Sequence, residues 1–263
     1  MIVIELRNVN KTFGNRKILD NISLQIEKGE TMVIMGGSGC GKSTLLRMII
    51  GALKPDSGEI FINGRDVTRL NEDEMNEVRK KFGMLFQSAA LFNSMNVGEN
   101  VALPLREHTK LNESIINIMV KMKLELVGLT GFENLKPSEI SGGMKKRVGL
   151  ARAIAMDPEI VFYDEPGAGL DPIVASVIDK LITDLSKKLG ITSVVVTHEM
   201  NSAFRVADRI TMLYQGRILE IGTPEEIKKT SNKVIQQFIS GSPDGPIPLK
   251  RSSADYLKDL TGG

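Results

Sequence analysis

The most informative segment of the sequence is a run of small residues that ends in a lysine and a serine. Residues 36–43 read Gly-Gly-Ser-Gly-Cys-Gly-Lys-Ser and match the pattern G-x-x-x-x-G-K-[ST]. Glycines let a backbone wrap closely around a phosphate, so that several N–H groups point toward it. Lys42 would reach the β- and γ-phosphates of a nucleotide, and the hydroxyl of Ser43 would ligate Mg²⁺. The segment predicts a nucleotide phosphate site rather than an accidental glycine-rich turn.

A pair of acids follows a short apolar run. Residues 160–163 read Ile-Val-Phe-Tyr, and Asp164 and Glu165 come next. An acid at the carboxyl end of a buried parallel strand lies at the sheet edge where ligands bind. Asp164 would hold Mg²⁺ through water, and Glu165 would polarise an attacking water. A solvated acidic loop is the alternative, but a phosphate loop in the same chain favours the catalytic interpretation.

Two histidines and one cysteine need separate interpretations. His198 directly follows the apolar run 193–197, which favours a contact with a γ-phosphate over a core or capping role. His108 has no such context, and we expect it at the surface. Cys40 lies within the glycine-rich segment, where we expect a tolerated small residue rather than a catalytic thiol.

The elements that must position these residues alternate between strands and helices. Strands are predicted where apolar residues alternate or form short runs, at 2–9, 22–26, 31–35, 59–62, 160–163 and 192–197. Helices are predicted at 43–50, 113–127, 141–156 and 172–188, and a hairpin at 209–221. The helix 113–127 carries an amphipathic stripe that comprises Ile115, Ile118, Met119, Met122 and Leu126. The alternation indicates an α/β fold with a mostly parallel sheet.

Composition places the chain among globular proteins and excludes disordered and fibrous ones. Of 263 residues, 41% are hydrophobic and 25% are charged. The 34 basic and 32 acidic residues give a net charge of +2, which argues against a dedicated nucleic-acid binder. A single cysteine excludes an internal disulfide and favours a reducing compartment. The first residues are interrupted by charges and no apolar run approaches the ~18 residues of a membrane span, so we expect a soluble, cytoplasmic protein.

Read in order, these segments resemble the ATPase subunit of ATP-binding cassette (ABC) transporters, from Phe13 to about Ser240. Further matches to that family are Gln87 for the Q-loop, residues 140–144 (Ile-Ser-Gly-Gly-Met) for the LSGGQ signature, Asp164 and Glu165 for the Walker B acids, 169–171 for the D-loop, His198 for the switch histidine and Phe13 for the adenine-stacking aromatic. Met144 replaces the usual signature glutamine, so the polar role of that residue is not carried over. Residues 167–169 (Gly-Ala-Gly) replace the Thr-Ser-Ala-like residues of many relatives, so the D-loop contacts are not carried over either. The remaining positions stand intact, namely Gly41, Lys42, Ser43, Gln87, Ser141, Gly143, Glu165 and His198, and the resemblance implies an active ATPase.

The resemblance implies a fold, two cofactors and a role for each of the site residues. It implies a P-loop core with a mostly parallel sheet, an N-terminal antiparallel β part and an inserted helical subdomain near 88–156, within an ATPase domain of residues 1–240 and a C-terminal tail of 241–263. The cofactors would be ATP and Mg²⁺. Glu165, His198 and Lys42 would be catalytic, and Ser43, Gln87 and Asp164 would serve the metal. Nucleotide would be bound by Phe13, Gly36, Gly37, Ser38, Gly39, Cys40, Gly41, Lys42, Ser43, Thr44, Gln87, Ser141, Gly142 and Gly143.

A homodimer is implied as well. Ser141 is predicted to cap a helix whose positive N-terminus, with Gly142 and Gly143, suits an anion. Within one subunit this second phosphate site has no companion. In the family, the signature of one subunit closes on the nucleotide of the other, and a two-fold interface creates two equivalent sites.

Three short segments resemble the subgroup that drives lipid transport with MCE-type proteins, the Mla type. They are residues 141–144, 103–109 and the tail around 244–248 with Asp255, Tyr256, Asp259 and Leu260. The resemblance implies phospholipid transport between two membranes, at the cytoplasmic face of the inner membrane, with a multispan permease, an MCE-domain protein and a small STAS-domain protein. The alternatives are an ATPase for polar-solute import, a non-transport ABC ATPase and an inactive regulatory module.

Two surfaces would contact such partners. Leu91, Phe92, Met95, Val97 and Leu103 would form a groove for a short permease helix, or would instead pack the inserted lobe. The tail would dock on a neighbouring subunit or on the STAS protein with Tyr256 and Leu257 as anchors, or would be disordered.

Overall fold

The computed structural model of the chain describes residues 1–247. Four strands form an antiparallel sheet in the order β2-β1-β4-β5. Their bounds are Ile2–Phe13 for β1, Arg16–Glu27 for β2, Ser57–Ile62 for β4 and Arg65–Asp66 for β5. Strand β1 continues past the predicted end at residue 9, because its pairing with β2 resumes after an irregular register between Leu6 and Val9.

The second sheet is mostly parallel, as predicted from the alternation of elements. Its six strands have the order β10-β9-β3-β8-β7-β6. Their bounds are Thr31–Met35 for β3, Phe82–Leu85 for β6, Ile160–Asp164 for β7, Thr192–Thr197 for β8, Arg209–Tyr214 for β9 and Arg217–Gly222 for β10. The strands from β9 to β6 run parallel, and β10 returns antiparallel to β9 at the edge.

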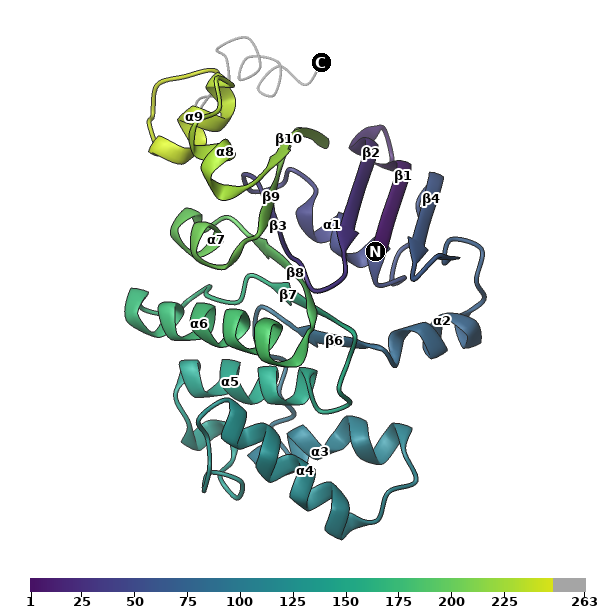
Figure 1. The fold of residues 1–263 in the computed structure, drawn as a ribbon, viewed down its shortest axis with the longest axis vertical. Coiled ribbons are helices and arrows are strands. Elements are labelled where there is room, and N and C mark those ends of the chain that lie inside the picture. The colour runs from purple at the N-terminus through teal and green to yellow at the C-terminus, as the bar shows by residue number, and fades with distance from the viewer. Residues whose placement is uncertain (248–263) are drawn as a thin grey trace, which may run out of the picture.

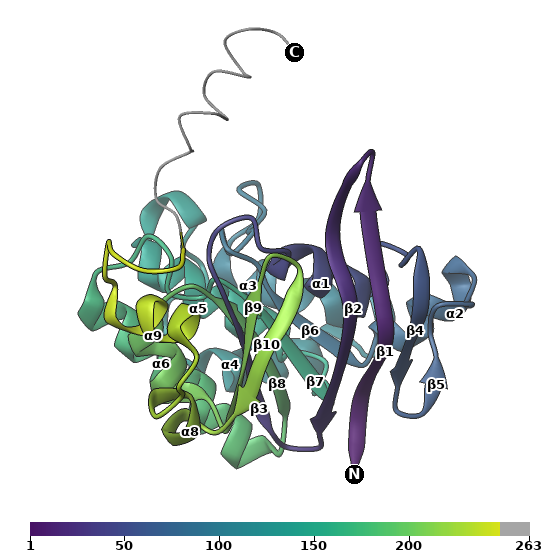
Figure 2. The ribbon, with the colours of Figure 1, turned by 90° about the horizontal axis from the view of Figure 1, so that it is seen from above.

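Helices cover this sheet and form a separate group at one end of the molecule. Their bounds are Lys42–Ile49 for α1, Glu72–Arg79 for α2, Val97–His108 for α3, Glu113–Leu126 for α4, Gly142–Ala153 for α5, Pro172–Leu189 for α6, Met200–Val206 for α7, Pro224–Lys228 for α8 and Lys233–Ser240 for α9, with a 3₁₀ turn at Pro137–Glu139. Figure 1 shows α3, α4 and α5 at the end of the molecule opposite α8 and α9. Figure 2 shows the antiparallel sheet on the side opposite α8 and α9.

The core lies on both faces of the parallel sheet. Along β3, Val33 and Met35 join the cluster that packs under the helices α3 to α6, whereas Met32 and Ile34 join the cluster between the two sheets. Successive side chains of a strand point to opposite faces, so a strand that is buried on both faces is apolar at every position. This explains the continuous apolar run of the sequence at residues 31–35.

Helix α4 lies where the sequence predicts it, but it packs through a different face. Ile118 and Met122 of the predicted stripe are 60% and 58% exposed. The residues of α4 that pack against α3 and α5 are Ile116, Val120 and Leu124, which are 2%, 4% and 0% exposed. Both sets have helical spacing, so spacing alone does not show which face meets the core. The predicted stripe is therefore mostly exposed, and of its residues Met119 packs against the core.

The predicted helix 141–156 is shorter in the structure. It ends at Ala153, and the next turn tightens, since the N–H of Ala155 donates to the carbonyl of Arg152 at 3.2 Å. Asp157 has a φ of +49°, which no right-handed helix can contain. The chain therefore leaves the helix before the proline at 158.

The start of the tail is held by the same chain, contrary to the expectation of a loose or partner-ordered segment from Ser242. The Gln237 amide of α9 donates from Nε2 to the Ser242 carbonyl at 3.3 Å, and its Oε1 accepts from the Ile247 N–H at 2.7 Å. The expected anchors Tyr256 and Leu257 lie outside the described residues.

Candidate nucleotide site

Four segments with predicted site residues leave the same edge of the parallel sheet. The glycine-rich segment follows β3, Gln87 follows β6, Asp164 ends β7, and His198 follows β8. The register pairs Met35 of β3 with Thr197 of β8, and Val196 of β8 with Asp164 of β7. Because the carboxyl ends of parallel strands meet at one edge, residues that are distant in the sequence are brought together there.

The glycine-rich segment forms a tight loop around the lysine that ends it. Lys42 is 7% exposed, and its Nζ donates to the carbonyls of Gly36 at 2.7 Å and Gly37 at 3.0 Å. Gly36 has a φ of +154°, and a Cβ there would lie 2.1 Å from the carbonyl oxygen of Leu213. Glycine is therefore required at this position. Helix α1 begins at Lys42, so its positive N-terminus points into the loop.

Two cavities flank this loop. The smaller one, of about 270 Å³, is lined by Phe13, Arg16 and Ile18 together with Gly39, Gly41, Lys42, Ser43 and Thr44. The ring of Phe13 is 51% exposed at this cavity, and Lys11 Nζ lies 5.6 Å from the ring centroid. The structure therefore brings Phe13 beside the loop, where a planar base could stack on it.

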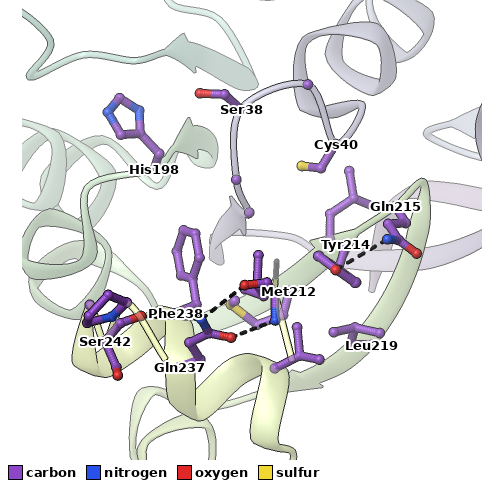
Figure 3. A pocket seen from close by; sticks show the side chains of 18 of the residues that line it. Ser38, Cys40, His198, Met212, Tyr214, Gln215, Leu219, Gln237, Phe238 and Ser242 are labelled. Carbon is purple, nitrogen blue, oxygen red and sulfur yellow. Dashed lines mark hydrogen bonds between the residues drawn. The ribbon is translucent and has the colours of Figure 1, made fainter. Parts of the chain in front are cut away.

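The larger cavity, of about 750 Å³, lies on another side of the loop. Residues 36–40 and His198 form one part of its lining, and residues of β9, β10 and α9 form another. The lining is completed by Arg16, Gln215, Gly241, Ser242, Pro243 and Ile247. Figure 3 shows Ser38, Cys40 and His198 together, with Gln237 and Phe238 across the cavity. Burial raises the pKa of the Cys40 thiol, and the charge of Lys42 only partly opposes this. The thiol is therefore a poor nucleophile, in line with the sequence interpretation.

The acids after β7 are held by groups after β8. Glu165 Oε1 lies 2.8 Å from His198 Nδ1, and Thr197 Oγ1 donates to Glu165 Oε2 at 3.1 Å. The Glu165 side chain is 12% exposed, whereas that of His198 is 53% exposed. Burial raises the pKa of Asp164, and the charge of Glu165 adds to this rise. The carboxylate of Glu165 is thus enclosed and fixed, with His198 on its solvent side.

The signature residues form a second, separate feature. The Ser141 side chain accepts a hydrogen bond from the Met144 N–H at 3.3 Å and caps α5, as predicted. A Cβ on Gly143 would lie 2.4 Å from Val174 Cγ1, so glycine is needed for α5 to pack against α6. Among the residues that the structure describes, Ser141, Gly142 and Gly143 do not line either cavity beside the phosphate loop.

The sequence analysis missed Lys146, which touches two of these segments. Its Nζ donates to the Gln87 carbonyl at 2.5 Å and to the Glu165 carbonyl at 3.2 Å. Burial lowers the pKa of Lys146, and the charges of Asp164 and Glu165 oppose that shift. The sequence places Lys146 one turn after Gly143 of the signature, but because its partners are backbone carbonyls, no residue type marks the contact.

Within residues 1–247, no helix has both the length and the apolar character that a membrane span requires.

Comparisons with known proteins identify the family and the relatives of the chain. Residues 19–168 match the ABC transporter family. Over 258 residues the chain is 46% identical to the "Intermembrane phospholipid transport system ATP-binding protein MlaF" of Haemophilus influenzae, with 98% of each chain covered. It is 44% identical over 248 residues to the "Probable ribonucleotide transport ATP-binding protein mkl" of Mycobacterium leprae, with 94% of this chain and 72% of that protein covered.

A solved structure extends the likeness to the fold. A dimeric post-hydrolysis state of an ATP-binding cassette, bound to ADP and Pi, superposes with a TM-score of 0.77 at 34% identity and covers 84% of this chain and 98% of that one. The predicted fold class is confirmed. With the phosphate loop, the paired acids and the histidine at one sheet edge, the chain belongs to the ABC transporter family of ATP-binding proteins.

Proposed function

We propose that the chain is the ATP-hydrolysing subunit of an inner-membrane ABC transporter that moves phospholipids between the membranes of a two-membrane envelope. One observation carries the ATPase part: the phosphate loop, Glu165 and His198 meet at one edge of the parallel sheet. The 46% identity to MlaF extends over 98% of both chains, which supports the phospholipid substrate.

The site residues have distinct roles in this proposal. The N–H groups of the phosphate loop and Lys42 bind the β- and γ-phosphates, and Phe13 stacks on the base. Glu165 orients the attacking water and accepts its proton, because Thr197 and His198 fix its carboxylate. His198 contacts the γ-phosphate from the solvent side. Phosphoryl transfer needs positioning and charge stabilisation more than covalent chemistry, and these residues supply both.

The residues present fit a magnesium ion that arrives with the nucleotide. Mg²⁺ takes oxygen ligands, and in such sites the protein gives few of them while phosphates and waters supply the rest. The Ser43 hydroxyl, the Gln87 amide and the Asp164 carboxylate offer such oxygens. Within residues 1–247, no cluster of three or more His, Cys, Asp or Glu side chains would hold a metal on its own. When bound, the ion neutralises charge on the phosphates.

The complete site requires two subunits. Ser141, Gly142 and Gly143 present a capped helix N-terminus, with α5 as its helix, away from the cavities of their own phosphate loop. In a head-to-tail homodimer they would close on the nucleotide of the other subunit, and one isologous interface would build both sites. The dimeric state of the solved cassette supports this arrangement for the present chain.

The permease would dock beside the Q-loop. A groove of about 430 Å³ lies there, with Phe82, Gly83, Met84, Phe86, Ala90, Phe92, Leu103, Pro104, Glu107, His108, Arg152, Ala153 and Met156 along it. Phe86 and Phe92 are 43% and 50% exposed in it. Of the five residues expected there, Phe92 and Leu103 line the groove, whereas Leu91, Met95 and Val97 do not. Val97 is buried at 0% exposure and Leu91 packs against the same core, which fits the alternative that these residues pack the inserted lobe. A short amphipathic cytoplasmic helix fits such an apolar groove.

The remaining assignments follow from the same proposal. Residues 1–240 form the ATPase domain, with the helical subdomain of about 88–156 inserted between β6 and β7, and residues 241–263 form the tail. The subunit sits at the cytoplasmic face of the inner membrane through its permease. An MCE-domain protein and a small STAS-domain protein complete the transporter. Nucleic acid is not a partner, in keeping with the balanced charge.

Purification of the tagged chain from its native membranes in mild detergent tests the substrate. The proposal expects a permease, an MCE-domain protein and phospholipid in one complex, with ATP turnover. Recovery of a solute permease with a periplasmic binding protein would keep the ATPase and overturn the phospholipid substrate. Recovery of ribosomes or DNA without any membrane protein would favour a non-transport ATPase. A complex that contains the partners but releases no phosphate would show that the chain is a regulatory module.

A further inference from the structure

A lysine of the signature helix is buried against carbonyl groups. Lys146 is 5% exposed, and within residues 1–247 its ammonium group forms no ion pair. It donates instead to the carbonyls of Gln87 and Glu165, at 2.5 Å and 3.2 Å. A buried charge is unfavourable unless hydrogen bonds satisfy it. The position of Lys146 is therefore fixed by these two carbonyls.

These contacts join three segments that are distant in the sequence. Gln87 follows β6, Glu165 follows β7, and these neighbouring strands pair in parallel. Lys146 lies in α5, whose N-terminus is formed by Ser141 and Gly142. One ammonium group thus connects the signature helix to two loops of the site at the sheet edge. An aliphatic side chain of the same length would fill the space without making either hydrogen bond.

The backbone of Glu165 needs such support. Its φ is +48°, in the left-handed region that side chains other than glycine disfavour. Residues in such conformations persist where their surroundings hold them, and they cluster at functional sites. The Glu165 N–H donates to the Val196 carbonyl at 2.8 Å, and its own carbonyl accepts from Lys146 and from the Ala168 N–H at 3.2 Å. The direction of the Glu165 carboxylate follows from this backbone conformation.

We propose that Lys146 is a positioning residue for hydrolysis: by holding the Glu165 and Gln87 carbonyls, it aims the Glu165 carboxylate at the attacking water only while α5 is docked on the core. The inference rests on the proposed ATPase function. The helix that offers its signature to the nucleotide of the partner subunit is then tied to the water-orienting glutamate of its own site. A shift of α5 would therefore alter the geometry of Glu165.

Three variants of the full chain, in the complex with which it co-purifies, test the proposal. Lys146→Met keeps the length of the side chain and removes both donors. We expect its kcat to fall about tenfold or more, while KM for ATP and the Kd for a fluorescent ATP analogue stay within about twofold of wild type. Lys146→Arg keeps a charged donor and should recover most of the turnover. Lys180→Gln removes an exposed charge on α6 and should leave turnover unchanged.

A second readout separates positioning from general damage to the fold. If Lys146 acts through Glu165, Lys146→Met in a Glu165→Gln background should lower the residual single-turnover rate by less than about twofold. A full additional tenfold loss in that background would overturn the proposal. Thermal unfolding checks each variant. If Lys146→Met fails to fold, Lys146→Leu, which likewise has no donor, takes its place, and the same kcat loss and the same lack of additivity are expected.

The remaining outcomes distinguish this inference from the proposed function. A Lys146→Met enzyme with wild-type kcat, or one whose only defect is a raised KM, would refute the positioning role and leave the ATPase intact. A wild-type complex that releases no phosphate would instead refute the proposed function, on which the inference rests.

Discussion

The imidazole of His198 lies against the carboxylate of Glu165, with Nδ1 2.8 Å from Oε1. An ionised carboxylate only accepts hydrogen bonds, so Nδ1 donates and Nε2 lies on the opposite side of the ring. In the neutral ring Nε2 would then be an acceptor, and only the imidazolium form would donate from Nε2 to a phosphate oxygen. The pair thus connects the group that orients water with the group that meets the γ-phosphate, through the adjacent strands β7 and β8.

Glu165→Gln should stop turnover and keep ATP binding. The amide retains the shape of the side chain but cannot accept a proton from water, so we expect phosphate release to fall about 100-fold or more. Because Lys42 and the phosphate loop are unchanged, ATP should trap a dimer, which size-exclusion chromatography with light scattering would detect. Glu125→Gln, at an exposed acid of α4 outside the site, is the control and should behave as wild type. Turnover near wild type in Glu165→Gln would contradict the assigned role.

Mixing two inactive variants tests whether each site is shared between subunits. Lys42→Ala disables the phosphate loop, and Ser141→Arg places a bulky cation at the signature. A mixed dimer contains one site with neither change, so a one-to-one mixture should recover up to about a quarter of wild-type turnover. Loss of the Ser141 cap costs about 1 kcal/mol, so thermal unfolding should confirm that the variant is folded. A mixture no more active than its components would mean that each subunit carries its own complete site.

Cys40 offers a probe of the phosphate loop, because it is the only cysteine of the chain. Burial raises the pKa of its thiol above the ordinary value of about 8.5, so the folded protein holds less thiolate than the unfolded chain at pH 8. Alkylation by iodoacetamide should be slow and should rise about tenfold per pH unit between about pH 7 and pH 9. ATP should slow it further. The alkylation rate of the unfolded chain in guanidinium is the reference. An equal alkylation rate in the folded protein would show that the Cys40 thiol is not protected by burial.

Phe92→Ala tests the groove beside the Q-loop. The side chain is 50% exposed, and the backbone of residue 92 stays anchored by the buried Asn100, so stability should change little. We expect recovery of the permease with the tagged chain to fall about tenfold, because an apolar anchor of the groove is lost. Phe132→Ala, at a partly exposed ring outside the groove, is the matched control. Equal permease recovery in both variants would place the docking surface elsewhere.

Local features were predictable where adjacent residues determine them. The phosphate loop depends on consecutive residues 36–43, and the strands of the parallel sheet depend on short apolar runs, so β3 and β8 have the predicted bounds. The Ser141 cap is equally local, because it requires only the N–H three residues later. The motifs in their order were sufficient to identify the family.

Where the sequence offers several equivalent apolar patterns, only the tertiary packing determines which of them contacts the core. Helix α4 carries two apolar stripes with helical spacing, and only the packing of α3 and α5 selects Ile116, Val120 and Leu124 for the core. The sequence left Val97 either in a groove or in the packing of the inserted lobe, and the structure places it in the core. Lys146 had no visible role in the sequence, because its partners Gln87 and Glu165 are carbonyls on loops that only the sheet register brings together. Hydrogen bonds to backbone groups leave no signature in residue types, and such contacts are therefore read only from the folded chain.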